Sequence, residues 1–271
     1  MSVSINTNII NAIRRCMYLL LGGLMVFAAP LSAGVVDRSK EISQYTVLVA
    51  SSTKNVRFAA LRELAWIGLS DQVLFDLVAN QLREKLAAKT LEIDLQETAL
   101  LMAALSGSGL AQFDALFNQV AKKTKNKQLK AEVKIAKKAL VRSAQLNPKK
   151  NSDQYVNAQI PFSVAVFLNF IYADELPMKR QAVKIIGAER MTNHHILQAL
   201  EIDISNNYLS ENKDSDWAIT YLQMCDVLVY AGGVGYGPLI KNVAHNAANE
   251  RLRNGAKDLI VKYELNQKNR L

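Results

Sequence analysis

The chain has 271 residues, of which 50% are hydrophobic and 21% are charged, and its formal net charge is +9. This composition excludes an intrinsically disordered chain, and the length suits one large domain or two small ones. Only 12 glycines and 5 prolines are present, while Ala, Leu, Lys and Gln recur, which favours helices over a turn-rich β fold.

The first 33 residues have the layout of a secretory signal peptide. Arg14 and Arg15 supply a positive region, and an apolar run of 14 residues extends from Cys16 to Ala29. That run is shorter than the roughly 20 residues that span a bilayer. We therefore predict cleavage after Ala33 and a periplasmic or secreted mature chain. Retention of the leader as a membrane anchor is the alternative.

Removal of this leader changes both the cysteine count and the charge. Cys225 is then the single cysteine, so an internal disulfide cannot form. The net charge falls to +7 and is unevenly distributed. Residues 122–150 hold eleven basic residues and one acid, Glu132, so the rest of the mature chain carries −3.

Apolar residues recur at spacings of three and four in a series of segments, which is the period of an α-helix. The pattern predicts helix pairs joined by short turns, with Ser70 as the N-cap of the second helix. The predicted pairs are 56–68 with 72–87, 98–105 with 110–121, 178–187 with 191–204, and 217–231 with 239–247, followed by a helix at 249–265. Helix, short turn, helix is the antiparallel αα-hairpin.

Three of these helices begin alike, with a basic residue followed by Ala at the third position and a large apolar residue at the seventh. The first contains Arg57, Ala60 and Leu64, and the pattern recurs from Lys179 and from Arg253. In these stretches the chain resembles the HEAT-like helical repeat family. The resemblance implies an all-α fold, an α-α superhelix of stacked antiparallel helix pairs that binds another macromolecule. A helical bundle without true repeats is the alternative.

One segment, residues 147–161, is rich in turn-forming residues and is predicted to be a surface loop. It divides the mature chain into an N-terminal helical repeat half, 34–146, and a C-terminal helical repeat half, 162–271. The apolar segment 162–172 directly after it is predicted to be a buried helix. Its eleven residues are too few to cross a membrane, and no transmembrane span is expected in the mature chain.

The basic segment 127–144 is predicted to be a helix with two stripes. One is apolar and faces the core, and the other is cationic and consists of Lys127, Lys130, Lys134 and Lys137. Such a stripe attracts anions, so we predict that these four lysines bind a partner. The candidates are another envelope protein and an anionic lipid or polymer, and a solvated face is the structural alternative. Nucleic acid is disfavoured, because the segment lacks interleaved aromatic residues.

No metal-binding or cofactor-binding residue is predicted. His194 and His195 are adjacent and would point about 100° apart on a helix, and His245 is distant in sequence. The glycine-rich segment 232–237 follows a predicted helix rather than a strand, so it is interpreted as an interhelical turn, with Pro238 opening the next helix.

No catalytic residue is predicted either. Cys225 lies in an apolar run without a neighbouring His, unlike a reactive thiol. The composition and patterns together favour a non-enzymatic binding or scaffold protein of the bacterial cell envelope. The second hypothesis is an envelope-associated protein that docks on anionic lipid or polymer through the lysines. The third is an enzyme of unknown type, which would need His194, His195 or Cys225 beside carboxylates.

Overall fold

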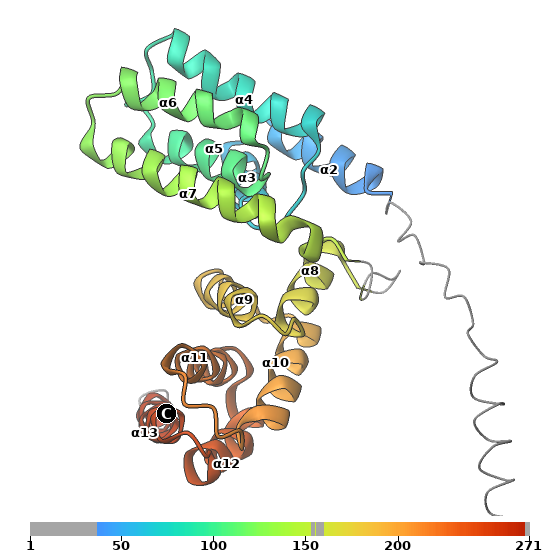
Figure 1. The fold of residues 1–271 in the computed structure, drawn as a ribbon, viewed down its shortest axis with the longest axis vertical. Helices are drawn as coiled ribbons and strands as arrows, with labels where there is room; N and C mark the ends of the chain where they lie inside the picture. Colours follow the sequence, from blue (N-terminus) through green and yellow to red (C-terminus); the bar gives the residue numbers. More distant parts are fainter. Residues whose placement is uncertain (1–36, 153–154, 156–159, 269–271) are drawn as a thin grey trace, which may run out of the picture. The chain divides into compact units, whose positions relative to one another are not determined.

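A computed structural model describes residues 37–152, 155 and 160–268. Within these residues the chain forms twelve α-helices and no strand, which confirms the predicted all-α class. In chain order they are α2 Ser39–Val49, α3 Lys54–Leu64, α4 Gln72–Ala87, α5 Leu95–Gly107, α6 Asp114–Lys123, α7 Lys127–Lys150, α8 Phe162–Ile171, α9 Leu176–Ala188, α10 His194–Asn207, α11 Ser215–Gly232, α12 Gly237–Asn246 and α13 Glu250–Lys268 (Figure 1). Two short 3-10 helices, η1 Ala111–Phe113 and η3 Gly233–Tyr236, precede α6 and α12.

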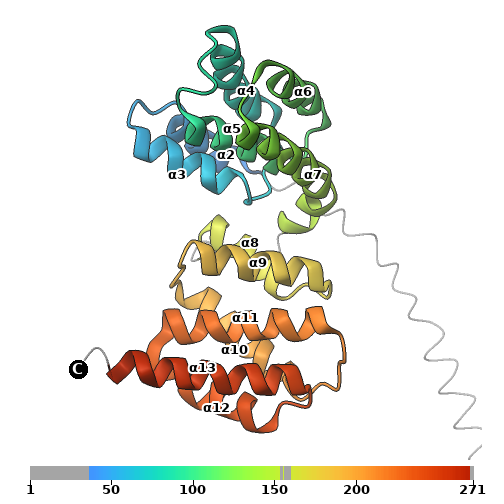
Figure 2. The ribbon, with the colours of Figure 1, turned by 90° about the vertical axis from the view of Figure 1, so that its left-hand side faces the viewer.

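Helices two apart in the chain lie side by side, which produces layers. In residues 39–150, α3, α5 and α7 contact one another in succession, and α2, α4 and α6 do the same. In the later part, α9, α11 and α13 form such a series, and α8 contacts α10. Figure 2 shows α11 and α13 running alongside each other. Most helices also contact the helix that follows them in the chain, as expected for successive hairpins.

A single apolar cluster runs through residues 45–256. Helix α8 is its most buried member, because nine of its ten residues are buried, as the apolar sequence predicted. The ring of Phe167 on α8 lies 4.5 Å from that of Trp66, which follows α3. Residues from both sides of the predicted 147–161 loop therefore share one core.

Several helix starts are stabilised by side-chain caps. Asp71 caps α4 by accepting a hydrogen bond from the Leu74 amide, a role that the sequence had suggested for Ser70. The Ser70 hydroxyl instead donates to the Ser108 carbonyl. Asn126 and Asn193 cap α7 and α10 in the same way as Asp71. Each cap satisfies a backbone N–H that has no partner within the helix.

The basic helix is longer than predicted. Helix α7 continues through Pro148 to Lys150 and so includes the first four residues of the predicted loop. The side-chain amide of Asn147 lies 2.9 Å from the Gly107 carbonyl and 3.0 Å from the Ser108 carbonyl. The Asn-Pro pair, a turn signal in the sequence, therefore lies inside a helix here, with the Asn147 amide nitrogen buried against carbonyl acceptors.

Two sequence predictions concern residues that the structure does not describe. The proposed leader, residues 1–33, lies outside the described residues, as do residues 153–154 and 156–159 of the predicted loop. In the part of the chain that the structure describes, no helix combines the length and the apolarity required to cross a membrane.

Candidate partner-binding surface of α7 and the neighbouring recesses

Helix α7 has the two-sided character that its sequence predicts. Leu129, Val133, Ala136 and Leu140 are buried against the core. The helix start is fixed by Glu92, whose Oε1 accepts hydrogen bonds from the Thr124 hydroxyl and from the amides of the next two residues. These hydrogen bonds lower the pKa of Glu92.

Three of the four predicted partner-binding lysines are open to solvent. Lys127, Lys130 and Lys134 are exposed, and the structure records no ion pair for them among the described residues. Lys137 is different, because its Nζ lies 3.2 Å from Oδ1 of Asp114 and donates to Asn118 at 3.0 Å, both on α6. Lys137 therefore helps to join α7 to α6, and its charge is already neutralised.

The other flank of α7 borders a groove of about 910 Å³, which we name the α7–α9 groove. Its wall on α7 includes Ile135, Lys138 and Arg142, and its wall on α9 includes Arg180 and Lys184. Arg62 and Trp66 contribute from α3 and the turn after it. The sequence placed Lys138 and Arg142 in the basic segment, but nothing in the period of α7 indicated that a second helix faces them.

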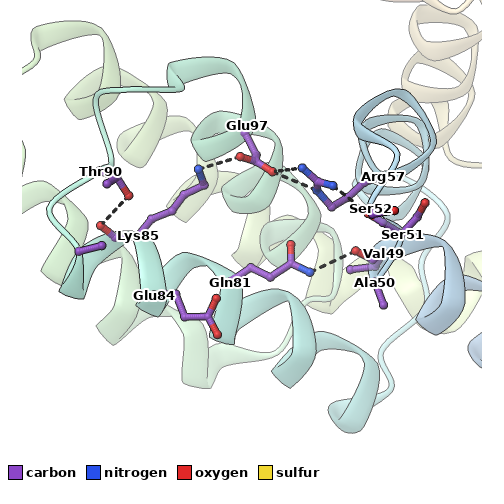
Figure 3. Close-up of a pocket in the computed structure, with 11 residues that line it drawn as sticks. Val49, Ala50, Ser51, Ser52, Arg57, Gln81, Glu84, Lys85, Thr90 and Glu97 are labelled. Carbon is purple, nitrogen blue, oxygen red and sulfur yellow. Dashed lines mark hydrogen bonds and ion pairs between the residues drawn. The ribbon is translucent and has the colours of Figure 1, made fainter.

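A second recess, of about 490 Å³, lies at the ends of α2–α5 (Figure 3). Glu97 stands at its centre, with Oε2 2.7 Å from Nζ of Lys85 and Oε1 2.8 Å from the Arg57 guanidinium. Burial alone would raise the pKa of Glu97, but the hydrogen bonds from Lys85 and Arg57 outweigh it and lower the pKa. Lys85 and Arg57 are therefore paired with Glu97 of the same chain, which indicates a structural role for this recess.

Lys179 is the basic residue of the second helix with the shared pattern of a basic residue, Ala and a large apolar residue. It also makes an ion pair. Its Nζ lies 2.5 Å from Oδ1 of Asp203 on α10, and both side chains are almost completely buried. Burial and the neighbouring Asp203 charge raise the pKa of Tyr221. Arg57 and Lys179 therefore link their helices to later ones. Arg253 instead donates to the Ala247 carbonyl.

A third recess, of about 790 Å³, lies where α4 ends beside the end of α6. Arg83, Lys89, Lys122 and Lys123 line it together with apolar side chains of which Leu86 and Leu91 are the largest. Glu92 is its one acidic lining residue and is held by the Thr124 hydroxyl and two backbone amides.

The histidines and the cysteine lie in ordinary helical settings. The rings of His194 and His195 are 5.7 Å apart at the start of α10, and His245 shares a hydrogen bond with the Lys241 carbonyl. Cys225 is fully buried, and burial with the nearby Asp226 charge raises its pKa to about 12. Among the described residues, no three His, Cys, Asp or Glu side chains are grouped as metal ligands.

The glycine-rich segment joins two helices, as its sequence predicts. Residues 233–236 form the 3-10 helix η3 between α11 and α12, and Pro238 stands in the first turn of α12.

Comparisons of the chain with protein-family models, with curated proteins and with solved structures gave no match.

Proposed function

We propose that the protein is a non-enzymatic, HEAT-like binding or scaffold protein of the bacterial cell envelope, which recognises an acidic macromolecular partner along α7. The observation that carries the proposal is the set of exposed lysines on α7 without an acidic partner in the described structure, Lys127, Lys130, Lys134 and Lys138. Unpaired cations on one helix attract an anionic surface and speed association with it.

The arrangement of the helices supports a repeat protein. Helices α3, α5 and α7 contact one another in succession, as do α9, α11 and α13, and such contacts are expected of stacked helix pairs. Such stacks present long helix surfaces to other macromolecules. The fully buried thiol of Cys225 gives the enzyme hypothesis no accessible nucleophile at that position.

Export is part of the proposal and has its own test. The leader predicts a mature chain that begins at Gly34 and is recovered from the periplasm or the medium. Cell fractionation followed by mass measurement of the intact chain checks both points. A chain of full length recovered with the membrane fraction would favour the retained anchor instead.

Capture from an envelope extract tests the binding function. Mature wild-type protein is compared with a variant in which the four exposed lysines of α7, Lys127, Lys130, Lys134 and Lys138, are each replaced by Glu; Lys137 is left unchanged because it pairs with Asp114. A discrete protein held by the wild type at physiological salt, and released as salt rises, supports the proposal. Loss of that protein from the variant supports the four lysines, whereas its retention places the contact on another surface.

Anionic phospholipid vesicles distinguish the second hypothesis. Co-sedimentation of the wild type with vesicles, without capture of any protein, would replace the acidic protein partner by a lipid surface. Failure of both the capture and the sedimentation would contradict a binding function through α7.

A further inference from the structure

The α7–α9 groove combines positive charge with an apolar floor. Five cationic side chains line it, Arg62, Lys138, Arg142, Arg180 and Lys184, against two acidic ones, Glu189 and Asp216. The groove therefore has an excess of three positive charges. Its volume is about 910 Å³.

Pairing within the groove leaves a specific part of this charge available. Arg62 lies 3.8 Å from Glu189, and Arg180 lies 2.8 Å from Asp216, so each acid is used by one arginine. Arg142 donates to the Pro177 carbonyl at 3.2 Å, which leaves its positive charge without a carboxylate among the described residues. Lys138 on α7 and Lys184 on α9 are exposed.

The groove also has an apolar part, to which Ile135, Ile185 and Trp66 contribute. Ile135 is 60% exposed although it is a large aliphatic residue, and it lines the groove beside Ile185. Trp66 also lines the groove and is 8% exposed, with its ring packed against that of Phe167. An aliphatic side chain that entered the groove would bury part of Ile135 and so gain hydrophobic free energy.

These properties select among anionic ligands. A single-stranded nucleic acid is held largely by bases stacked on open aromatic faces, and Trp66, the one aromatic lining residue, is nearly covered. A bilayer surface is flat, whereas this site is recessed between helices. An acidic polypeptide segment that also carries aliphatic side chains matches both the excess charge and the apolar floor.

We infer that the α7–α9 groove binds an extended, acidic segment of a partner protein, with carboxylates on Lys138, Arg142 and Lys184 and an aliphatic side chain on Ile135. This inference rests on the proposed binding function and assigns it a site and a partner chemistry. Of the exposed lysines of α7 it assigns direct contact to Lys138, on the α9 flank, and leaves Lys127, Lys130 and Lys134 to attract the partner at longer range.

Two charge-matched variants test the location. The groove variant carries Lys138→Glu, Arg142→Glu and Lys184→Glu, and the stripe variant carries Lys127→Glu, Lys130→Glu and Lys134→Glu. Each changes the net charge by six units, so long-range attraction is reduced by a similar amount. The probe is a fluorescein-labelled synthetic peptide in which Glu and Leu alternate, measured by fluorescence anisotropy at physiological salt.

We expect the groove variant to bind this peptide about tenfold more weakly than the wild type, or worse, and the stripe variant to lose less than about threefold. Circular dichroism of both variants checks that the helices are intact. Equal losses in the two variants, or a larger loss in the stripe variant, would overturn the location of the site while the binding function stands.

The apolar part of the inference has its own matched pair. Ile135→Gln removes the aliphatic floor, and Val141→Gln changes a residue of the same helix that is 63% exposed and does not line the groove. Ile135→Gln should weaken binding of the Glu–Leu peptide by about threefold to tenfold without affecting an oligoglutamate peptide, and Val141→Gln should change neither.

The outcomes separate this inference from the proposed function. Capture of an envelope protein together with no binding of either peptide by the wild type would overturn the acidic-segment assignment alone. Equal binding of oligoglutamate and the Glu–Leu peptide would overturn the apolar anchor. No capture and no peptide binding would overturn both proposals.

Discussion

The Nζ of Lys150 lies 5.2 Å from the centre of the Phe170 ring. The Lys150 side chain has no exposed surface. Among the described residues this nitrogen has no hydrogen-bond partner. Burial, and to a lesser degree the nearby Arg142 charge, lowers the pKa of Lys150 to about 8. The aromatic face compensates for only part of the lost hydration.

Stability should therefore rise with pH in the range that Lys150 controls. The pKa is about 8 in the folded chain and 10.5 in the unfolded one, so between these values the unfolded chain binds more protons. The free energy of unfolding should increase by up to about 3 kcal/mol across this range. Urea unfolding between pH 7.5 and 9.5 measures the rise in this window as the difference between the wild type and a Lys150→Met variant. That difference cancels the opposing effect of Cys225, whose thiol ionises at lower pH in the unfolded chain than in the folded one.

Lys150→Met supplies the control for this pH dependence. Met retains most of the volume and removes the charge, so the variant should be more stable than the wild type at pH 7 by about 1–3 kcal/mol. Its stability should lack the rise between pH 8 and 9.5 that Lys150 gives the wild type. Parallel pH profiles for the two proteins would contradict a depressed pKa at this lysine.

Gly107→Ala should destabilise the protein although it lies inside a helix. A Cβ there would stand 2.4 Å from the Leu64 carbonyl oxygen, and a backbone atom cannot move aside easily. We expect a loss of more than about 2 kcal/mol in the free energy of unfolding, since overpacking outweighs helix propensity.

Gly187→Ala is the matched helical control. Its added Cβ would meet only the Val227 side chain, at an ordinary 3.6 Å. This variant should gain about 0.5–1 kcal/mol from helix propensity alone. Thermal unfolding of both proteins gives the comparison, and a loss at Gly187 as large as that at Gly107 would show that close packing is not the cause.

The ion pairs of Glu97 should make the protein sensitive to acid. The pKa of Glu97 is lower when folded than when unfolded, so its contribution is present above about pH 4.5 and is lost as the pH falls through the folded pKa. Glu97→Gln should cost about 1–3 kcal/mol at pH 7 and unfold with a shallower dependence on acid. An unchanged acid profile would count against this pair.

Lys179→Met should cost about 3–5 kcal/mol, because it leaves the buried Asp203 carboxylate without its cation. The double variant Lys179→Met with Asp203→Leu should recover most of that loss. Lys149→Met, which breaks the half-exposed pair with Glu175, should cost no more than about 1 kcal/mol. Urea unfolding ranks the three, and equal losses at Lys179 and Lys149 would contradict the role of burial.

The sequence predicted the local structure better than the long-range contacts. Helix α4 has the predicted ends, Gln72 and Ala87, because its apolar period and the turn before it are local signals. Lys150 could not be predicted in the same way. Its burial depends on the turn at Gly68, where an added Cβ would lie 2.6 Å from the Lys150 Cδ.

The α7–α9 groove also could not be predicted from the sequence of α7. The period of α7 separates its buried side from its solvent side, but it does not say which flank another helix faces. The sequence therefore favoured Lys127, Lys130, Lys134 and Lys137 equally. The structure distinguishes Lys137, which pairs with Asp114, and places α9 across a groove from Lys138.

The amide of Asn147 determines where α7 stands along its own axis. Its nitrogen reaches Ser70, Gly107 and Ser108 together only at one position of the helix. A helix that presented only aliphatic residues could slide by one turn and still bury a similar area. Here such a slip would leave the Asn147 amide unpaired and take its hydrogen bond from the Gly107 carbonyl, so Asn147 selects a single register and thereby fixes which cations face α9.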